Sequence, residues 1–203
     1  MKKLKINIGC ASRLLKGYLN IDMDSLDTIK SRYPELDIDD DKEFLQADVF
    51  DLPFEENSLD EIRGDGIVEH FSFSEEPKFF YTAQKLLKKG GLLNFSVPDF
   101  EDAVRRWIEA KDEWKDFFRE DEEAKKKQHW FGQYSYSRES RWGYLTTCIF
   151  GNQTGEGQYH KNAYTEPKIR AILEKIGFNA PTIERFLWKG DRDLMMRVKS
   201  TKK

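Results

Sequence analysis

Residues Lys5–Asp22 read KINIGCASRLLKGYLNID, and the interpretation of the rest of the chain depends on them. An apolar strand over residues 4–8 runs into Gly9, and a second strand, Tyr18–Ile21, ends in Asp22. A glycine after a first strand admits a ligand close to the backbone, and a carboxylate that ends the next strand can accept hydrogen bonds from both hydroxyls of a ribose. The stretch favours a nucleoside-containing ligand at the carboxyl edge of a parallel sheet, although a tight turn between two ordinary strands has the same pattern.

Length and composition favour one folded domain. The chain has 203 residues and a formal net charge of −3, so it can bury a core and presents no overall basic field for nucleic acid. No apolar run approaches the ~20 residues of a membrane span, and the start, MKKLKINIGC, is too short for a signal peptide. Cys10 and Cys148 make neither a disulfide framework nor a metal-ligand cluster. We therefore expect a cytoplasmic protein without a metal, a nucleic-acid partner or a membrane partner.

Strands and helices are predicted to alternate along the first half of the chain. Further strands are predicted over residues 44–49, 59–63 and 92–97, and helices within 25–42 and over 75–88. Gly90-Gly91 is expected to end the second of these helices. Such alternation favours a parallel sheet with helices on both faces.

The second half departs from this alternation. Asp99 is expected to cap a helix over residues 100–118, and aromatic residues are frequent from 128 to 164. We expect an insertion over residues 100–164 of a single 1–203 domain to form a lid or an acceptor region, with an aromatic mini-core as the alternative. A helix from Thr165 and a hairpin of strands 182–188 and 194–199 follow.

Several segments occur in one characteristic order along the chain. They are Ile6–Cys10, Gly17–Asp22, Ala47–Phe54, Ser58–Ile62, Val68–Phe71, Leu87–Gly91, Val97–Asp99, Tyr159–Lys161 and Gly177–Phe178. In this order they resemble the class I S-adenosylmethionine-dependent methyltransferases, and most closely a compact subgroup with a shortened first crossover. The resemblance implies an α/β, doubly wound, Rossmann-like and mostly parallel sheet with an antiparallel C-terminal strand. Gly9 and Asp22 are too close in sequence for a full crossover helix, so a loop or a very short helix is expected between them.

The resemblance implies S-adenosylmethionine as the cofactor and a site above the first four strands. Its implied contacts are Gly9, Cys10 and Ala11 with the methionine part, Asp22 and the adjacent Met23 with the ribose, Asp48 and Val49 with the adenine, and Asp65 and Gly66 with the edge near the sulfonium. Because the cofactor carries no phosphate, the missing anion-binding helix start should not prevent its binding.

The remaining candidates concern the methyl acceptor. His160 is the first candidate for a general base, with a structural or substrate-binding role as the alternative, and His70 with Glu69 comes next. Asp99, Tyr159 and Trp142 are the candidates for acceptor binding, although a helix cap is the simpler role for Asp99.

The substrate class is inferred from what the fourth-strand region lacks. Gly64–Ile67 stands where methyltransferases of nucleic-acid amino groups carry an Asn/Asp-Pro-Pro-aromatic run, so a nucleic-acid acceptor is disfavoured. Because relatives of the compact subgroup often accompany sugar or cell-surface glycan biosynthesis, the resemblance implies a small-molecule or glycan-type hydroxyl as the acceptor. The alternatives are a degenerate S-adenosylmethionine-binding module without turnover and a NAD-dependent dehydrogenase. The dehydrogenase is disfavoured because the full glycine fingerprint is absent.

Overall fold

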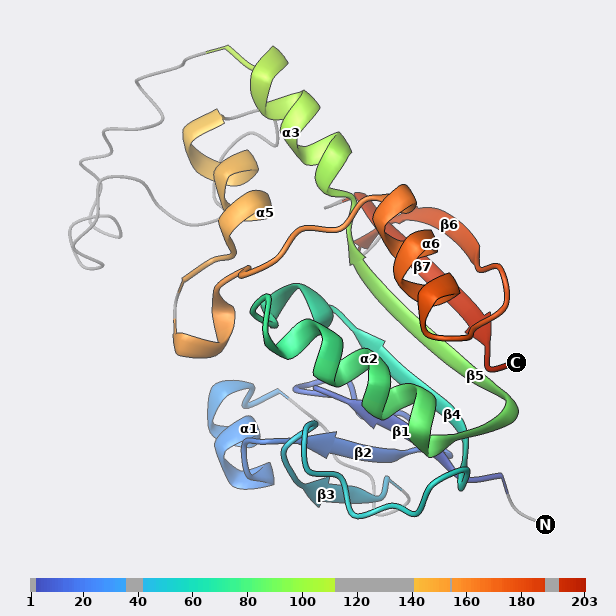
Figure 1. Ribbon diagram of the computed structural model, residues 1–203. Helices are drawn as coiled ribbons and strands as arrows, with labels where there is room; N and C mark the ends of the chain where they lie inside the picture. Colours follow the sequence, from blue (N-terminus) through green and yellow to red (C-terminus); the bar gives the residue numbers. More distant parts are fainter. Residues whose placement is uncertain (1–2, 36–41, 112–140, 154, 189–193) are drawn as a thin grey trace.

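Seven strands form one mixed sheet in the computed structural model, which describes residues 3–35, 42–111, 141–153, 155–188 and 194–203 (Figure 1). The strands are β1 (Lys5–Ile8), β2 (Leu19–Asp22), β3 (Phe44–Gln46), β4 (Leu59–Asp65), β5 (Leu87–Pro98), β6 (Thr182–Leu187) and β7 (Leu194–Thr201). Their order is β3-β2-β1-β4-β5-β7-β6, with parallel pairs from β3 to β5 and with β7 antiparallel to both β5 and β6. The predicted Rossmann-like sheet with an antiparallel C-terminal strand is confirmed.

Helices connect the strands, and two of them pack on one face of the sheet. The α-helices are α1 (Leu26–Arg32), α2 (Glu75–Leu86), α3 (Phe100–Glu109), α5 (Thr146–Phe150) and α6 (Glu166–Lys175), with short turns η1 (Val68–His70), η3 (Arg141–Leu145) and η4 (Glu156–Gln158). Figure 1 shows α2 and α6 in front of the same side of the sheet. Among the described residues, no helix combines the length and the apolar character needed to cross a bilayer.

The core lies between the sheet and α2 and α6. Alternate strand residues such as Ile62, Phe95 and Val198 are buried and belong to the same apolar cluster as Phe80 of α2 and Leu173 of α6. Successive strand side chains point to opposite faces, so these alternating apolar residues place one whole face of the sheet in the core. Burial of this face is the main stabilising term for the fold.

The opposite face of the sheet is polar. The strand register aligns Asn7 of β1 with Arg63 of β4, Asn94 of β5 and Lys199 of β7 in one row across the sheet. The neighbouring row joins Asp65, Ser96 and Arg197. This face carries buried and half-buried charges that must be satisfied by one another.

A loop replaces the first crossover helix, as expected from the short spacing. Its anchor is Asn20 of β2, whose Oδ1 accepts from Asn7 Nδ2 at 2.9 Å and from the Leu15 amide at 2.7 Å. Asn20 Nδ2 donates to backbone carbonyls, the Glu43 carbonyl among them at 3.0 Å, while Asn7 Nδ2 also reaches the Arg13 carbonyl at 2.8 Å. Two buried asparagines therefore hold the loop where a helix would otherwise pack.

Several predicted boundaries were wrong. The helix predicted to reach Lys88 ends at Leu86, and Gly90-Gly91 lies inside β5, not at a helix end. The β4–β5 register shifts at this point, and a Cβ on Gly91 would lie 2.8 Å from the Lys88 carbonyl oxygen, so the glycines permit a bulge. The third strand ends at Gln46, before the predicted Val49.

Helices α2 and α6 begin without a side-chain N-cap, and some predicted segments cannot be compared with the structure. Ser74 and Thr165 make no side-chain cap hydrogen bond; at α2 the Glu75 carboxylate instead accepts from the Ser72 amide at 2.7 Å. The extension of the third helix to residue 118, the aromatic residues up to 140 and the hairpin turn 189–192 lie outside the described residues.

Candidate functional site

The carboxyl ends of four neighbouring parallel strands meet at one edge of the sheet. Gly9 follows β1, Asp22 ends β2, Asp48 comes shortly after β3, and Asp65 ends β4. In open α/β sheets ligands bind outside the carboxyl ends of the strands. The structure thus brings four of the predicted cofactor residues to the edge at which a ligand is expected.

The Asp22 carboxylate is held in a fixed orientation at this edge. Its Oδ2 accepts from the Ala11 amide at 2.8 Å, and its Oδ1 accepts from the Asp24 amide at 3.1 Å. Ala11 adopts a left-handed φ of 40° in the turn that follows β1. A carboxylate oxygen has two lone pairs, so each oxygen of Asp22 can accept one further hydrogen bond from a ligand hydroxyl.

Gly9 is needed for contact between two loops. Its φ is 56°, and a Cβ built on it would lie 2.3 Å from Ile67 Cδ1. Ile67, in the turn after β4, therefore occupies the space that a side chain on Gly9 would take. Besides the predicted approach of a ligand, a glycine is therefore required here by the packing of the β4 turn on the β1 turn.

Gly9→Ala is expected to lower the free energy of unfolding by about 2–4 kcal/mol, from left-handed strain and from overpacking against Ile67. Gly17→Ala is the matched control, because Gly17 also has a positive φ of 79° but nothing lies within 4 Å of its built Cβ. Urea denaturation of both variants measures the difference. Equal losses at the two positions would show that Ile67 does not enforce the glycine.

The two other predicted contacts next to these strands differ in exposure. Cys10 is buried, and its amide donates to the Ile21 carbonyl at 3.1 Å. Burial, with the charge of Asp22 adding to it, raises the pKa of the Cys10 thiol to about 12, so the thiol stays protonated. Met23 is 71% exposed, which leaves its side chain accessible beside Asp22.

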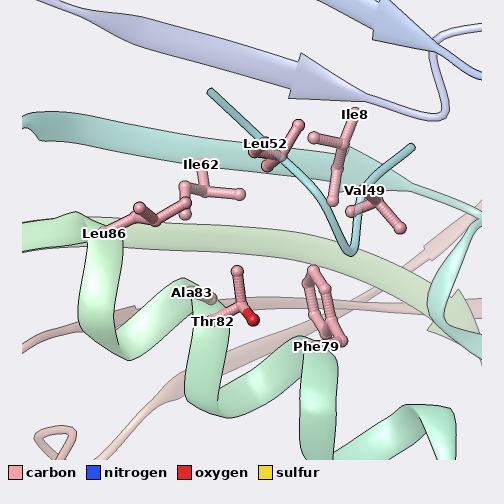
Figure 2. Close-up of a pocket in the computed structure, with 8 residues that line it drawn as sticks. All are labelled: Ile8, Val49, Leu52, Ile62, Phe79, Thr82, Ala83 and Leu86. Carbon is pink, nitrogen blue, oxygen red and sulfur yellow. The ribbon is translucent and has the colours of Figure 1, made fainter. Parts of the chain in front are cut away.

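The predicted adenine contacts lie in the turn after β3. Asp48 is exposed, and its Oδ1 accepts from the Phe50 amide at 2.9 Å, which stabilises the turn. Val49 lines a small apolar pocket between the sheet and α2, together with residues such as Leu52 and Phe79 (Figure 2). The Val49 side chain thus contributes to packing beneath the edge, and only its backbone and the Asp48 side chain remain for a ligand.

Asp65 lies at the centre of an arginine cluster on the polar face of the sheet. Its carboxylate is 2.7 Å from Arg63, 3.2 Å from Arg197 and 3.5 Å from Arg13, and Ser96 Oγ donates to it at 2.8 Å. Burial alone would raise the pKa of Asp65, but the hydrogen bonds from Ser96 and Arg63 and the nearby positive charges outweigh it and lower the pKa. The Asp65 carboxylate is therefore engaged in the sheet.

Asp65→Asn is expected to lower the free energy of unfolding by about 2–3 kcal/mol, since it leaves Arg63 and Arg197 without their buried counter-charge. Because the folded pKa lies below the ordinary value of 3.8, this stability is present above pH 3.8 and is lost as the pH falls through the folded pKa. The difference in the free energy of unfolding between wild type and Asp65→Asn should therefore decrease in acid. Asp60→Asn, at a surface ion pair with Lys88, is the control with the smaller expected loss. A difference in the free energy of unfolding that stays unchanged below pH 3 would contradict the pairing of the ionised Asp65 carboxylate with the arginines.

The three predicted catalytic residues come together. Glu69 and His70 lie in η1, and His160 follows η4; one ligand atom of each lies within 4.8 Å of the others. The imidazole rings of His70 and His160 are 5.0 Å apart at an interplanar angle of 72°. Lys161 and Asn162 donate their amides to the Glu69 carbonyl, which fixes the two segments together.

Hydrogen bonds set the tautomers of both imidazoles. His70 Nδ1 lies 2.9 Å from the Tyr159 carbonyl, and His160 Nδ1 lies 3.1 Å from the Cys148 carbonyl. A carbonyl oxygen only accepts, so each Nδ1 carries the proton and the neutral ring has its lone pair on Nε2. Burial lowers the pKa of His70, although its hydrogen bond to Tyr159 opposes this, so the ring is neutral near pH 7.

Glu69 is the buried member of this cluster. It is 4% exposed, and its Oε2 has no hydrogen-bond partner in the described part of the chain. Burial raises the pKa of Glu69 to about 8, and the charge of Asp65 acts in the same direction. A Cβ on Gly66 would lie 3.6 Å from Glu69 Oε1, so the cluster borders the end of β4.

The predicted acceptor residues are distributed differently. Tyr159 is 42% exposed and supplies the carbonyl that binds His70, so it belongs to the cluster. Asp99 caps α3 by accepting from the Asp102 amide at 3.3 Å, and it pairs with Arg185 at 2.8 Å, which confirms its helix-cap role. Trp142 in η3 packs against Trp107 of α3 with ring centroids 5.6 Å apart.

The sequence and the fold of the chain are similar to those of known proteins. Residues 9–95 match the model described as a methyltransferase domain. The match covers β2, β3, β4 and most of β5, so this part of the chain is similar to a methyltransferase domain. Together with the sheet topology, this confirms the resemblance to the class I S-adenosylmethionine-dependent methyltransferases, whose cofactor is S-adenosylmethionine.

Solved structures of S-adenosylmethionine-dependent methyltransferases share the fold of this chain. An S-adenosylmethionine-dependent methyltransferase from Methanosarcina mazei is 16% identical with a TM-score of 0.57, over 100% of this chain and 93% of that one. One from Mesorhizobium loti is 15% identical with a TM-score of 0.55, over 99% and 91%. The magnesium protoporphyrin IX methyltransferase from Synechocystis, solved with bound S-adenosylhomocysteine, is 12% identical with a TM-score of 0.55, over 99% and 74%. No curated protein matches the chain in sequence.

The residues at this edge of the sheet fit S-adenosylmethionine. Asp22 presents an oriented carboxylate at the end of β2, as a ribose diol requires, and it is half-buried and not sealed from solvent. Gly66 has a φ of 72° and leaves the end of β4 without a side chain. A methyltransferase cofactor needs no phosphate site, so the loop that replaces the first helix is compatible with it.

Sequence reasoning missed several residues that build the site. Asn20 and Ile67 organise the loops, and Arg13 links the β1 loop to Asp65 and stacks 4.5 Å from the Trp188 ring. An asparagine within the LNID strand was a usable signal, because asparagine is depleted in strands. The arginine cluster had no local signal, since its members are far apart in the sequence.

Proposed function

We propose that this methyltransferase acts on a hydroxyl group of a small-molecule or glycan-type acceptor. The observation that carries the proposal is the Glu69, His70 and His160 cluster beside the cofactor edge. The two imidazoles have their lone pairs on Nε2, so they can accept a hydroxyl proton. A hydroxyl acceptor needs such a group, because it is a poor nucleophile until its proton is removed.

The cofactor would be held at the strand ends. Asp22 would accept from the ribose hydroxyls, Asp48 and the Val49 backbone would adjoin the adenine, and the segment from Gly9 to Ala11 would contact the methionine part. When bound, S-adenosylmethionine supplies the electrophilic methyl group. The Asp65 carboxylate is occupied by arginines, so we assign the edge near the sulfonium to Gly66.

The acceptor would be positioned by the cluster and its surroundings. His160 Nε2 would accept the hydroxyl proton, while the Nδ1–H bond to the Cys148 carbonyl keeps the ring oriented. His70 and Glu69 would fix the hydroxyl oxygen, and Tyr159 would cover one side of it. The predicted insertion 100–164, which includes Trp142, would supply the rest of the acceptor region. Positioning a nucleophile in this way can contribute several kcal/mol.

Transfer of a radiolabelled methyl group from S-adenosylmethionine to a panel of acceptors tests this function. The panel should contain sugars and phenols as hydroxyl acceptors, with amines and carboxylates as the comparison. Label is expected in the hydroxyl compounds, with one S-adenosylhomocysteine formed per methyl transferred. Transfer confined to amines or carboxylates would contradict the proposed acceptor class.

A binding module without turnover is the second candidate. It is favoured by the Ile67 side chain, which packs on Gly9 where the loop was expected to face a ligand. Isothermal titration together with the transfer assay separates the two functions. S-adenosylmethionine binding without formation of S-adenosylhomocysteine, with any acceptor, would favour the module.

A further inference from the structure

We propose that Glu69, His70 and His160 form a binding site for a divalent first-row transition-metal ion. The ligand atoms would be Glu69 Oε2, His70 Nε2 and His160 Nε2. The proposal rests on the proposed function only for its catalytic role, because metal binding itself requires neither the cofactor nor an acceptor. No metal was expected from the sequence, because Cys10 and Cys148 form no ligand cluster and Glu69 and His160 are distant in the chain.

The composition and the spacing of the cluster suit a transition-metal ion. Two imidazoles and one carboxylate suit borderline transition metals, and this set leaves coordination positions open for other ligands. One ligand atom from each residue lies within 4.8 Å of the other two. Bonds of about 2.0–2.2 Å to one shared ion place its ligand atoms about 3–4 Å from one another. Side-chain movements of about 1 Å would therefore bring the three ligand atoms to metal-binding separations.

The two imidazoles are oriented as metal ligands are. Each histidine donates its Nδ1 proton to a backbone carbonyl, His70 to Tyr159 at 2.9 Å and His160 to Cys148 at 3.1 Å. In metal sites the ligating histidine typically donates its other ring N–H to a carbonyl or a carboxylate, which fixes the tautomer and the ring orientation. Both histidines already have the hydrogen bonds that metal ligands have.

The buried oxygen Glu69 Oε2 favours a bound cation. Glu69 is 4% exposed, and its Oε2 has no hydrogen-bond partner among the described residues. A buried carboxylate oxygen without a partner is costly, and buried charges are normally paired or coordinate a metal. A cation between Glu69 and the two imidazoles would satisfy this oxygen.

The site defines the chemistry of the substrate more closely. Three protein ligands would leave at least one open position, and octahedral ions would leave three. An acceptor with two adjacent oxygens, such as a vicinal diol, could bind the ion through both. With the ion bound, His160 Nε2 would be a ligand and not the base. The ion would polarise the acceptor oxygen as a Lewis acid beside the cofactor edge, and water would take the hydroxyl proton.

Titration of the chelator-stripped, untagged chain with Co²⁺ tests the proposal. The visible absorption of bound Co²⁺ should appear and saturate at one ion per chain. His70→Gln and His160→Gln, which keep a polar side chain of similar length, should each weaken Co²⁺ binding at least about 100-fold. His129→Gln, at the third histidine of the chain, is the matched control and should bind as wild type does.

The outcomes separate this proposal from the proposed function. Equal Co²⁺ affinity in wild type, His70→Gln and His160→Gln, with circular dichroism confirming that the variants are folded, would overturn the metal site. Methyl transfer that persists in excess chelator would likewise overturn its catalytic role and leave His160 as the base. Co²⁺ binding that depends on both histidines would support the site even if no acceptor were methylated, and the proposed function alone would then fail.

Discussion

Asp22→Ala is expected to remove most of the thermal stabilisation that saturating S-adenosylmethionine confers. A ligand at 100 times its dissociation constant adds about 2.7 kcal/mol to the free energy of unfolding, which is a shift of several degrees for a chain of this size. The carboxylate is the group at the end of β2 that can accept from both ribose hydroxyls, and two backbone amides orient it. Its loss should weaken binding at least about 100-fold, since charge-assisted hydrogen bonds are each worth about 1.5–3 kcal/mol.

Two further variants make this result interpretable. Asp22 also holds the Ala11 and Asp24 amides, so the melting temperature without ligand must be compared as well. Asp22→Asn retains a side-chain acceptor for one of the two amides and should keep more of the ligand-free stability while still losing affinity. Asp24→Ala removes a neighbouring carboxylate that pairs with Arg32 at 2.9 Å, and its ligand-induced shift should match wild type. An unchanged shift in Asp22→Ala would mean that the ribose lies elsewhere.

His160→Ala is expected to lower kcat for a hydroxyl acceptor by about 10²–10⁴-fold, the range that a positioned general base contributes. The cofactor affinity should change little, because the cluster adjoins the end of β4 and not Asp22. A separate titration of S-adenosylmethionine measures that affinity. Lys161→Ala, at the exposed neighbouring side chain, is the control and should retain turnover within a few-fold.

The pH profile distinguishes catalysis from folding. A general base must be deprotonated to act, so wild-type kcat/KM should show an acidic limb that disappears in His160→Ala. Wild-type turnover and an unchanged pH profile in His160→Ala, with its true acceptor, would exclude the role of His160 in proton removal.

The fold was predictable because its determinants are local. Alternating strand and helix segments, and the short connection between the two terminal strands, predicted the parallel sheet and its antiparallel end. The short spacing between Gly9 and Asp22 predicted the missing crossover helix. Gly90-Gly91 was misassigned because a glycine pair at a helix end and one at a bulge look alike until the partner strand is known.

The site was predicted only in part. Strand ends meet at one edge whatever the side chains, so the positions of Asp22 and Asp48 followed from the sheet. The engagement of Asp65 could not be predicted, because Arg197 reaches it from the other end of the chain. His160 was proposed separately from the pair Glu69 and His70, and the proximity of the three residues depends on backbone contacts between η1 and the segment after η4. The sequence does not specify such tertiary contacts locally.

A crystal structure with S-adenosylhomocysteine tests the central claim most directly. The account predicts that both ribose hydroxyls lie within hydrogen-bond distance of the Asp22 carboxylate and that the sulfur faces the Glu69, His70 and His160 cluster. A ribose bound away from Asp22, or a sulfur separated from the cluster by Ile67, would contradict it.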